Sequence, residues 1–340
     1  MLKILVTGGA GYIGSHTIVD LIENGYEVIS IDNYSRSNKK VIEGIHAITG
    51  VHVKNYEIDL CNYYQTSQVF EAEKNVAGII HFAAYKSVGE SVEFPIMYYE
   101  NNMNSLFNIL KCIQEFKIQH FVFSSSCSVY GNVKKLPVTE STPLSKPECA
   151  YAATKQMGEQ VILDFIKTSA SNAILLRYFN PVGAHLSGLI GEVPYGKPNN
   201  LVPIITQTAI GLHDKMYVWG NDYQTRDGSC IRDYIHVMDI ASAHTLAFDY
   251  LLNQRNQSNY EIFNAGSGNG VSVLEAIQSF ENISGIKLNY EMGPRRPGDV
   301  EAIYANNDLI AAQLGWRPKH NLDTMMKTAW DWEKNLSGKL

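Results

Sequence analysis

The stretch Thr7-Gly8-Gly9-Ala10-Gly11-Tyr12-Ile13-Gly14-Ser15 decides the fold of this chain. It lies between the apolar run Ile4-Leu5-Val6 and a helical pattern, so it predicts a strand, a tight turn and the start of a helix. Gly8 can adopt backbone angles closed to other residues, Gly11 has no Cβ to hold a phosphate away, and Gly14 lets the helix approach the sheet. The free N–H groups of such a helix start can bind a pyrophosphate.

The next apolar run, Glu27 to Ile31, ends in Asp32, about twenty residues past the glycines. A carboxylate there accepts hydrogen bonds from an adenosine ribose and repels a 2′-phosphate, so the pattern favours NAD over NADP. Two alternatives stay open. Asp32 could be a turn-forming residue before Asn33, and the nearby Arg36 could accommodate a 2′-phosphate.

The composition is that of an ordinary globular protein. The 340 residues suit one large domain with a smaller lobe. The net charge of −6, without a stripe of basic residues, argues against a nucleic-acid surface. No apolar run approaches the ~18 residues of a membrane span, and Met1 to Ile4 leads straight into the first strand, so we expect no membrane segment and no signal peptide.

Cysteine usage bears on compartment and metal binding. The five cysteines are an odd number without C-x-x-C spacing, which predicts reduced thiols in a cytoplasmic protein. The same scatter predicts no zinc or other metal site. The positions are Cys61, Cys112, Cys127, Cys149 and Cys230.

Short β-rich runs alternate with helical patterns beyond the glycine turn. They are Val51 to Ile58, Gly78 to Phe82, His120 to Ser124 and Ala173 to Arg177. The alternation predicts an α/β fold, a doubly wound parallel sheet (Rossmann-like) with helices on both faces. Ligands of that fold bind beyond the carboxyl ends of the strands. The site should therefore involve the residues after each run: Asp59-Leu60, Ala83 to Lys86, Ser124 to Ser126 and Tyr178 to Asn180.

The composition of the sequence changes after about residue 180, where Gly, Pro and Asn become frequent. We expect residues 1–180 to form the dinucleotide-binding domain and residues 181–340 to form a smaller C-terminal substrate-binding lobe. A helical pattern from Val237 to Leu252, followed by an apolar run at Ile262, predicts a return to the sheet around residues 236–268.

The segment Tyr151-Ala152-Ala153-Thr154-Lys155 opens a predicted helix, and its spacing puts phenol and ammonium on one face. Alone, the pattern is typical of a solvated helix face. After a dinucleotide fold and a serine run at a strand end, it predicts a general base, Tyr151. Its pKa, near ~10 when free, must fall, and an ammonium and a positively charged nicotinamide both act in that direction. Ser126 should hydrogen-bond the reacting oxygen; the alternative for these serines is a strand-to-loop cap, which fits Ser124 better.

These motifs resemble the extended short-chain dehydrogenase/reductase superfamily and, more narrowly, its UDP-glucose 4-epimerase family. The resemblance covers nearly the whole chain. Two departures, Ala152-Ala153-Thr154 between tyrosine and lysine and Arg226 where an acidic residue is common, remove no group that the chemistry needs. The matching segments are Gly8 to Ser15, His81 to Lys86, Val88 to Ser91, Tyr98 to Asn102, Ser124 to Gly131, Tyr151 to Lys155, Arg177 to His185, Arg232 to Val237 and Arg296 to Asp299.

The resemblance implies reversible inversion at C4 between UDP-glucose and UDP-galactose through a 4-keto sugar, with NAD as hydride acceptor and donor. It implies that Tyr151, Lys155 and Ser126 are catalytic. The implied NAD-binding residues are Gly8, Gly11, Tyr12, Ile13, Gly14, Asp32, Asn33, Asp59, Leu60, Phe82, Ala83, Ala84, Lys86, Asn101, Ser124, Tyr151, Lys155 and Phe179. The implied UDP-hexose-binding residues are Lys86, Ser126, Tyr151, Asn180, Asn200, Leu201, Trp219, Arg232, Arg296, Asp299 and Ile303.

Arg232 and Arg296 also suit a diphosphate chemically, because guanidinium forks match phosphate oxygens. A structural Arg–Asp pair is the alternative, for Arg232 with the adjacent Asp233 and most of all for Arg295, which is not among the expected ligands. The resemblance further implies a homodimer through the helices near residues 101–116 and 151–167.

Ile303 stands four residues past Asp299, where the resemblance implies a side chain beside the sugar whose bulk decides whether an N-acetyl group at C2 fits. Isoleucine is shorter than tyrosine, so we expect UDP-N-acetylglucosamine to be epimerised too, more slowly than UDP-glucose. The alternative is a core residue that faces away from the pocket.

Two other functions compete with epimerisation. Nucleotide-sugar dehydratases of the same superfamily resemble one another in carrying Asp-Glu where this chain has Cys127-Ser128, so dehydration lacks its acid and base here. A non-catalytic dinucleotide sensor would be expected to lose Tyr151 or Lys155, and both are present.

Overall fold

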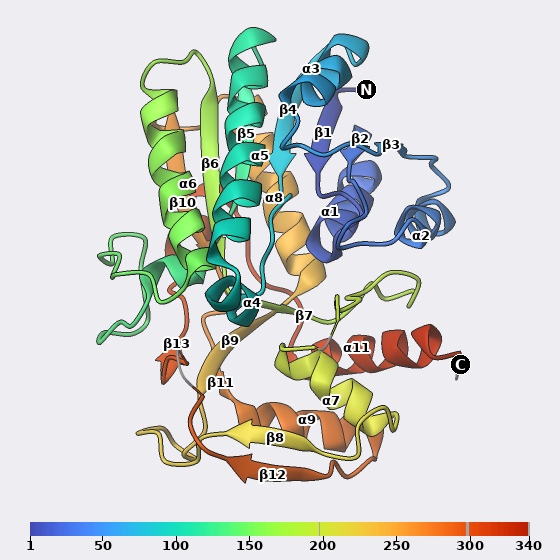
Figure 1. The fold of residues 1–340 in the computed structure, drawn as a ribbon, viewed down its shortest axis with the longest axis vertical. Helices are drawn as coiled ribbons and strands as arrows, with labels where there is room; N and C mark the ends of the chain where they lie inside the picture. The colour runs from blue at the N-terminus through green and yellow to red at the C-terminus, as the bar shows by residue number, and fades with distance from the viewer. Residues whose placement is uncertain (197, 297–298, 339–340) are drawn as a thin grey trace.

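A seven-stranded parallel sheet forms the centre of the molecule, with strand order β10-β6-β5-β4-β1-β2-β3 (Figure 1). The computed structural model describes residues 1–196, 198–296 and 299–338. The strands are β1 (Lys3–Thr7), β2 (Glu27–Ile31), β3 (Lys54–Tyr56), β4 (Val76–His81), β5 (His120–Ser126), β6 (Asn172–Tyr178) and β10 (Tyr260–Ala265). The predicted doubly wound α/β fold is confirmed.

Helices cover both faces of this sheet because its strands are apolar on both sides. One buried cluster joins Ile4 and Val6 of β1 to Ile18 and Phe248 of the helices on that face. A second joins Leu5 to Leu106 on the opposite face. The first face carries α1 (Tyr12–Glu23), α2 (Lys40–Thr49) and α8 (Val237–Leu252), and the second carries α3 (Tyr63–Ala72), α5 (Pro95–Glu115) and α6 (Ala150–Ile166).

Two strand lengths differ from the sequence prediction. The run Val51 to Ile58 gives only the short edge strand β3, which pairs on one side alone and has no fully buried residue. Strand β5 instead continues through Ser126, because Ser124, Ser125 and Ser126 pair with β6 as far as Tyr178. The serine run is therefore the last part of a buried strand.

A smaller layer of structure lies beyond the carboxyl ends of the large sheet (Figure 1). It has its own apolar core, in which Ile205, Phe280 and Met326 are buried. Its strands are β7 (Asn180–Val182), β8 (Met216–Trp219), β9 (Ile231–His236), β11 (Gly270–Ser272), β12 (Tyr290–Gly293) and β13 (Ala302–Ile303). Its helices are α7 (Leu201–Ala209), α9 (Val273–Ser284) and α11 (Leu322–Leu336).

The remaining helices are α4 (Val88–Glu93), which precedes α5, and α10 (Asp308–Leu314), whose Ile310 joins the core under α8. In the part of the chain that the structure describes, no helix has the length and apolarity needed to cross a bilayer.

Candidate active site

The glycine turn packs tightly against the loop that follows β4. Gly8 has a φ of 68°, and a Cβ built on it would lie 2.9 Å from the backbone N of Ala83. A Cβ on Gly14 would lie 2.2 Å from the carbonyl O of Gly8, so this glycine lets the helix close onto the turn itself. Gly9, for which no role was predicted, is equally confined, because its Cβ would meet Ser30 Oγ at 2.3 Å.

The start of α1 has the form of an anion-binding cradle. Gly11 is the N-cap residue and supplies no side-chain cap. The first-turn N–H groups, at Tyr12, Ile13 and Gly14, precede any intrahelical acceptor. These amides and the positive end of the helix dipole favour a phosphate here.

The position of Asp32 is compatible with both of the roles left open above. Its Oδ1 accepts hydrogen bonds from Tyr34 N at 2.9 Å and Ser37 Oγ at 2.7 Å, as a turn-forming aspartate does. Its Oδ2 accepts from Ala10 N at 3.0 Å, which places the carboxylate beside the glycine turn, where a ribose would lie. Arg36 points elsewhere: its guanidinium pairs with Glu90 Oε1 at 2.9 Å.

The other predicted cofactor residues lie in the segments that follow the strands. Lys86, after β4, pairs with Glu192 Oε1 at 2.8 Å, and Asn101 lies on α5, where its side chain donates to Asn102. Leu60 is buried. Asn33, Asp59, Phe82, Ala83, Ala84 and Phe179 complete the set, after β2, β3, β4 and β6.

Tyr151 and Lys155 occupy the first two turns of α6, on the face that packs against the end of β5. Lys155 Nζ donates to the carbonyl O of Ser124 at 2.5 Å. It lies 6.0 Å from the centre of the Tyr151 ring and 4.9 Å from that of Phe123. The predicted placement of phenol and ammonium on one helix face is thus present, and only 5% of Lys155 is exposed.

Burial dominates the electrostatics of this pair. Burial raises the pKa of Tyr151 to about 12, and a hydrogen bond with Ser126 offsets only part of that rise. Burial also lowers the pKa of Lys155 to about 7, against attraction by Glu159. Desolvation of the phenol thus outweighs its hydrogen bond with Ser126, and the fall in pKa that we expect from a positively charged nicotinamide stays a prediction.

The serines divide their roles in the opposite way to the prediction. Ser126 Oγ accepts from Ser128 N at 3.2 Å and caps a short 3-10 helix at Cys127–Tyr130. Ser124 Oγ instead hydrogen-bonds Tyr178 OH within the sheet. The expectation that Ser124 was the better cap is wrong, because β5 continues through Ser126 before the chain turns. Ser126 also hydrogen-bonds Tyr151, and its predicted contact with the reacting oxygen stays a prediction.

A buried ion pair supports this strand end. Arg177 and Glu159, each 4% exposed, join through Nη2 and Oε2 at 2.6 Å. Ser125 Oγ donates to Glu159 Oε1 at 2.5 Å, and Arg177 Nη1 donates to Tyr130 OH at 3.1 Å. Sequence reasoning missed this network, although an arginine inside an apolar strand pointed to a buried partner.

Arg232 and Arg296 meet around one carboxylate. Arg296 donates through Nε and Nη2 to the two oxygens of Asp299, both at 3.0 Å. Arg232 Nη2 lies 3.7 Å from Asp299 Oδ1. The alternative pairing of Arg232 with Asp233 is wrong, because Asp233 faces inward and accepts hydrogen bonds from Ser267, Gly268 and Ala305.

Arg295 forms a structural pair, as expected, with its Nε at 2.7 Å from Asp222 Oδ1. Pro297 and Gly298, which belong to the matching motif between Arg296 and Asp299, lie outside the described residues. The two candidate phosphate ligands therefore come from β9 and from the segment after β12.

The other predicted substrate residues belong to the smaller layer. Trp219 ends β8 with 38% of its surface exposed, and Gly293 lies under it, since a Cβ there would be 2.9 Å from the ring. Asn200 precedes α7 and donates to Glu192 Oε1 at 2.9 Å. Leu201 begins α7, and Asn180 begins β7.

Ile303 is only 5% exposed and belongs to a buried cluster, as the core alternative required. That cluster also contains Phe179, and Cys127 packs against it. Ile303 therefore belongs to the cluster against which Cys127, the residue after Ser126, packs. Its effect on sugar choice stays a prediction.

No group of three or more His, Cys, Asp or Glu side chains with metal-binding potential occurs within residues 1–196, 198–296 and 299–338. All five cysteines are free thiols. The predicted site residues instead supply backbone and side-chain amides, hydroxyls, the Asp32 carboxylate, Lys86, Lys155 and a pair of arginines.

Known proteins are similar to this chain in sequence and in architecture. A family model described as GDP-mannose 4,6 dehydratase matches residues 5–329. The chain is 43% identical over 339 residues to the UDP-glucose 4-epimerase of Bacillus subtilis, which covers 99% of this chain and 98% of the relative. The chain belongs to the UDP-glucose 4-epimerase family.

Solved structures of UDP-glucose 4-epimerases agree with the fold. The enzyme of Stenotrophomonas maltophila, solved with bound NAD and formylated UDP-arabinopyranose, is 40% identical, has a TM-score of 0.96 and covers the whole of both chains. The UDP-Glc/GlcNAc 4-epimerase of Campylobacter jejuni is 37% identical, with a TM-score of 0.85 over 98% of this chain and 100% of that one. The family resemblance predicted from the sequence is confirmed.

Proposed function

We propose that the chain is an NAD-dependent UDP-glucose 4-epimerase, which interconverts UDP-glucose and UDP-galactose through a transient 4-keto sugar. The observation that carries this proposal is the placement of Tyr151, Lys155 and Ser126 at the end of β5, on the same edge of the sheet as the glycine turn. Relatives of full-length similarity carry this activity in their names.

The residues present fit NAD. The amides of the uncapped α1 start suit the pyrophosphate, Asp32 suits a ribose with free hydroxyls, and the engagement of Arg36 with Glu90 leaves it away from a 2′-phosphate. Lys86, Asn101 and the residues after β3, β4 and β6 would complete the site. Bound there, NAD would supply a hydride acceptor and donor for C4 and a positive charge beside Tyr151.

Tyr151 would hold and return the proton of the C4 hydroxyl. To take that proton the phenol must be ionised, a form that the positive charges of bound NAD and of Lys155 would favour, and Ser126 hydrogen-bonds the phenol oxygen. Lys155, fixed by the Ser124 carbonyl, positions the end of the cofactor site and stabilises the ionised phenol when it forms.

The nucleotide end of the substrate would be gripped apart from the sugar. Arg232 and Arg296 would exchange Asp299 for a diphosphate, and the exposed Trp219 ring offers a flat apolar face for uracil. Holding the non-reacting end leaves the 4-keto sugar free to turn, so hydride can return to either face.

Dehydration, named in the matching family model, is disfavoured by the residues at Cys127-Ser128. Burial raises the pKa of the Cys127 thiol to about 12, so it cannot serve as a base near neutrality. Neither residue supplies the carboxyl groups that removal of water requires.

We extend the proposal to sugar choice, organisation and setting. The Campylobacter jejuni relative, described as a UDP-Glc/GlcNAc 4-epimerase, supports slower epimerisation of UDP-N-acetylhexosamines. Residues 1–180, with a return around 236–268, would form the NAD domain, and 181–340 the UDP-sugar lobe.

Exposed Phe107 on α5 and Met157 on α6 support a homodimer through these helices. The free thiols support a cytoplasmic protein.

The test is to supply the purified protein with NAD and UDP-galactose and to follow UDP-glucose by chromatography. Formation of UDP-glucose without accumulation of NADH is the expected result. Formation of a 4-keto-6-deoxy sugar would favour the dehydratase alternative, and binding of NAD without turnover would favour the sensor.

A further inference from the structure

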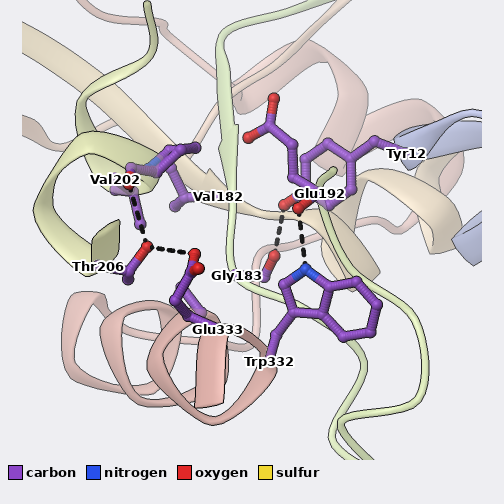
Figure 2. Close-up of a pocket in the computed structure, with 10 residues that line it drawn as sticks. Tyr12, Val182, Gly183, Glu192, Val202, Thr206, Trp332 and Glu333 are labelled. Carbon is purple, nitrogen blue, oxygen red and sulfur yellow. Dashed lines mark hydrogen bonds between the residues drawn. The ribbon is translucent and has the colours of Figure 1, made fainter. Parts of the chain in front are cut away.

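Residues 183–196 form a strap between β7 and α7 (Figure 1). The strap is fixed to the smaller layer through α11: Trp332 Nε1 donates to Glu192 O, and Asn335 Nδ2 donates to Gly188 O, both at 2.8 Å. Figure 2 shows Trp332 and Tyr12 on the same side of the strap, bonded to Glu192 and Gly183.

The strap also crosses the edge of the large sheet where the dinucleotide should bind. Tyr12 of the α1 start donates from its hydroxyl to Gly183 O at 2.5 Å. Lys86, in the segment after β4, pairs with Glu192 at 2.8 Å. The same Glu192 oxygen accepts from Asn200 at 2.9 Å, so one carboxylate joins a predicted cofactor residue to a predicted substrate residue.

Arg36, in the segment after β2, holds the far end of the strap. Its guanidinium carbon lies 4.1 Å from the centre of the Tyr195 ring on the strap and 4.5 Å from that of Tyr85. Glu90 supplies the counter-charge at 2.9 Å. A planar guanidinium can stack on two aromatic faces while its edge binds a carboxylate, which lysine cannot do.

The strap therefore touches the segments after β1, β2 and β4, all of which carry residues expected to bind NAD. The Arg36 side chain is 27% exposed, and the Glu192 side chain is 11% exposed, so neither contact is fully screened by water. These contacts thus join the strap to the three segments expected to surround the dinucleotide.

We propose that Arg36 and Glu192 fasten the strap over the dinucleotide site and thereby slow the release of NAD. The inference rests on the proposed function, because it assigns NAD to this edge of the sheet. It makes Arg36 a positioning residue that acts through Tyr195.

The test measures how fast NAD leaves. Protein loaded with NAD is diluted into an excess of isotopically labelled NAD, and the bound nucleotide is released by acid at intervals and measured by mass spectrometry. Arg36→Ala should speed exchange about 2- to 5-fold, because it removes one cation–ring contact to the strap, that with Tyr195, and such a contact contributes ~0.5–1 kcal/mol. Tyr195→Ala should speed exchange similarly, and Glu192→Gln about 2- to 5-fold, as for a partly exposed ion pair.

Two matched controls keep the test specific. Tyr195→Phe retains the ring and should exchange like the wild type. Arg226→Ala breaks a comparable Arg–Glu pair, with Glu275, in the smaller layer and should have no effect on NAD exchange. Unfolding curves of all variants show whether any of them exchanges NAD faster only because its folded state is less stable.

Faster exchange in Arg36→Ala with none in Tyr195→Ala would mean that Arg36 binds NAD directly, and would overturn the strap. Unchanged exchange in all three variants would overturn it as well. Turnover of UDP-galactose by the wild type is measured separately. If the wild type epimerises the sugar but the variants exchange NAD at the wild-type rate, only the role of the strap is contradicted and the proposed function is not.

Discussion

The two sides of the candidate site are built differently. On the proposed catalytic side, Lys155 and Ser126 are buried at the end of a strand and fixed by hydrogen bonds, and the partly buried Tyr151 contacts Ser126. The nucleotide side consists of Arg232 and Arg296, which come from the smaller layer. Both guanidinium groups pair with Asp299, so they are not free to bind a diphosphate until these pairs open.

This difference matches what each side has to do. Proton transfer requires groups that are fixed to within a fraction of an ångström before reaction, and burial supplies that order. A diphosphate requires charges that can change partners, because the ion pairs with Asp299 must open as the ligand arrives. The difference therefore predicts separate kinetic effects for the two sides.

The largest effect is expected on the catalytic side. Tyr151→Phe should lower kcat by ~100- to 10,000-fold, because only the proton-carrying oxygen is lost. NAD content should be unchanged, since the ring still packs. Quantifying nucleotide in the same sample as turnover separates the two effects, and full turnover in this variant would remove Tyr151 from catalysis.

The nucleotide side should respond in KM. Arg232→Ala or Arg296→Ala should raise KM for UDP-galactose by about 10- to 100-fold, as for loss of a charged hydrogen-bond partner, with a smaller change in kcat. Arg295→Ala, which breaks only the Asp222 pair, is the matched control. A defect confined to kcat would contradict the anchoring role of the two arginines.

The sequence predicted the catalytic side better than its surroundings. The glycine turn and the Tyr151–Lys155 spacing are local patterns whose geometry follows from one turn and one helix. The Arg177–Glu159 pair and the Arg36–Tyr195 contact join segments far apart in the chain, so no local pattern indicates them. The wrong cap assignment of Ser124 came from a strand end misplaced by two residues.

The choice between sugars tests whether the side chain of Ile303 lies close enough to the substrate to affect which sugar binds. Ile303→Tyr should lower kcat/KM for UDP-N-acetylglucosamine relative to UDP-glucose by roughly 5- to 100-fold, the scale of discrimination by pocket size. Rates on both sugars in wild type and variant provide the measurement. An equal loss on both sugars would indicate only repacking of the cluster with Phe179.

The smallest effect concerns the burial of Lys155. Its pKa of about 7 lies below that of an unfolded lysine, so between pH 7 and 9 the unfolded chain binds more protons and stability rises with pH. The wild type should gain about 1 kcal/mol per pH unit relative to Lys155→Met over this range. Denaturant unfolding of the ligand-free proteins measures this, and parallel pH profiles would show that Lys155 stays charged.

In the proposed mechanism the sugar turns while its nucleotide stays bound, and hydride returns from NAD to C4, the carbon that it left. UDP-galactose deuterated at C4 tests this directly when it is converted in unlabelled water with the NAD-loaded protein. The label should be retained at C4 of the UDP-glucose formed, because the hydride never exchanges with solvent. Loss of the label to water would contradict the proposed mechanism.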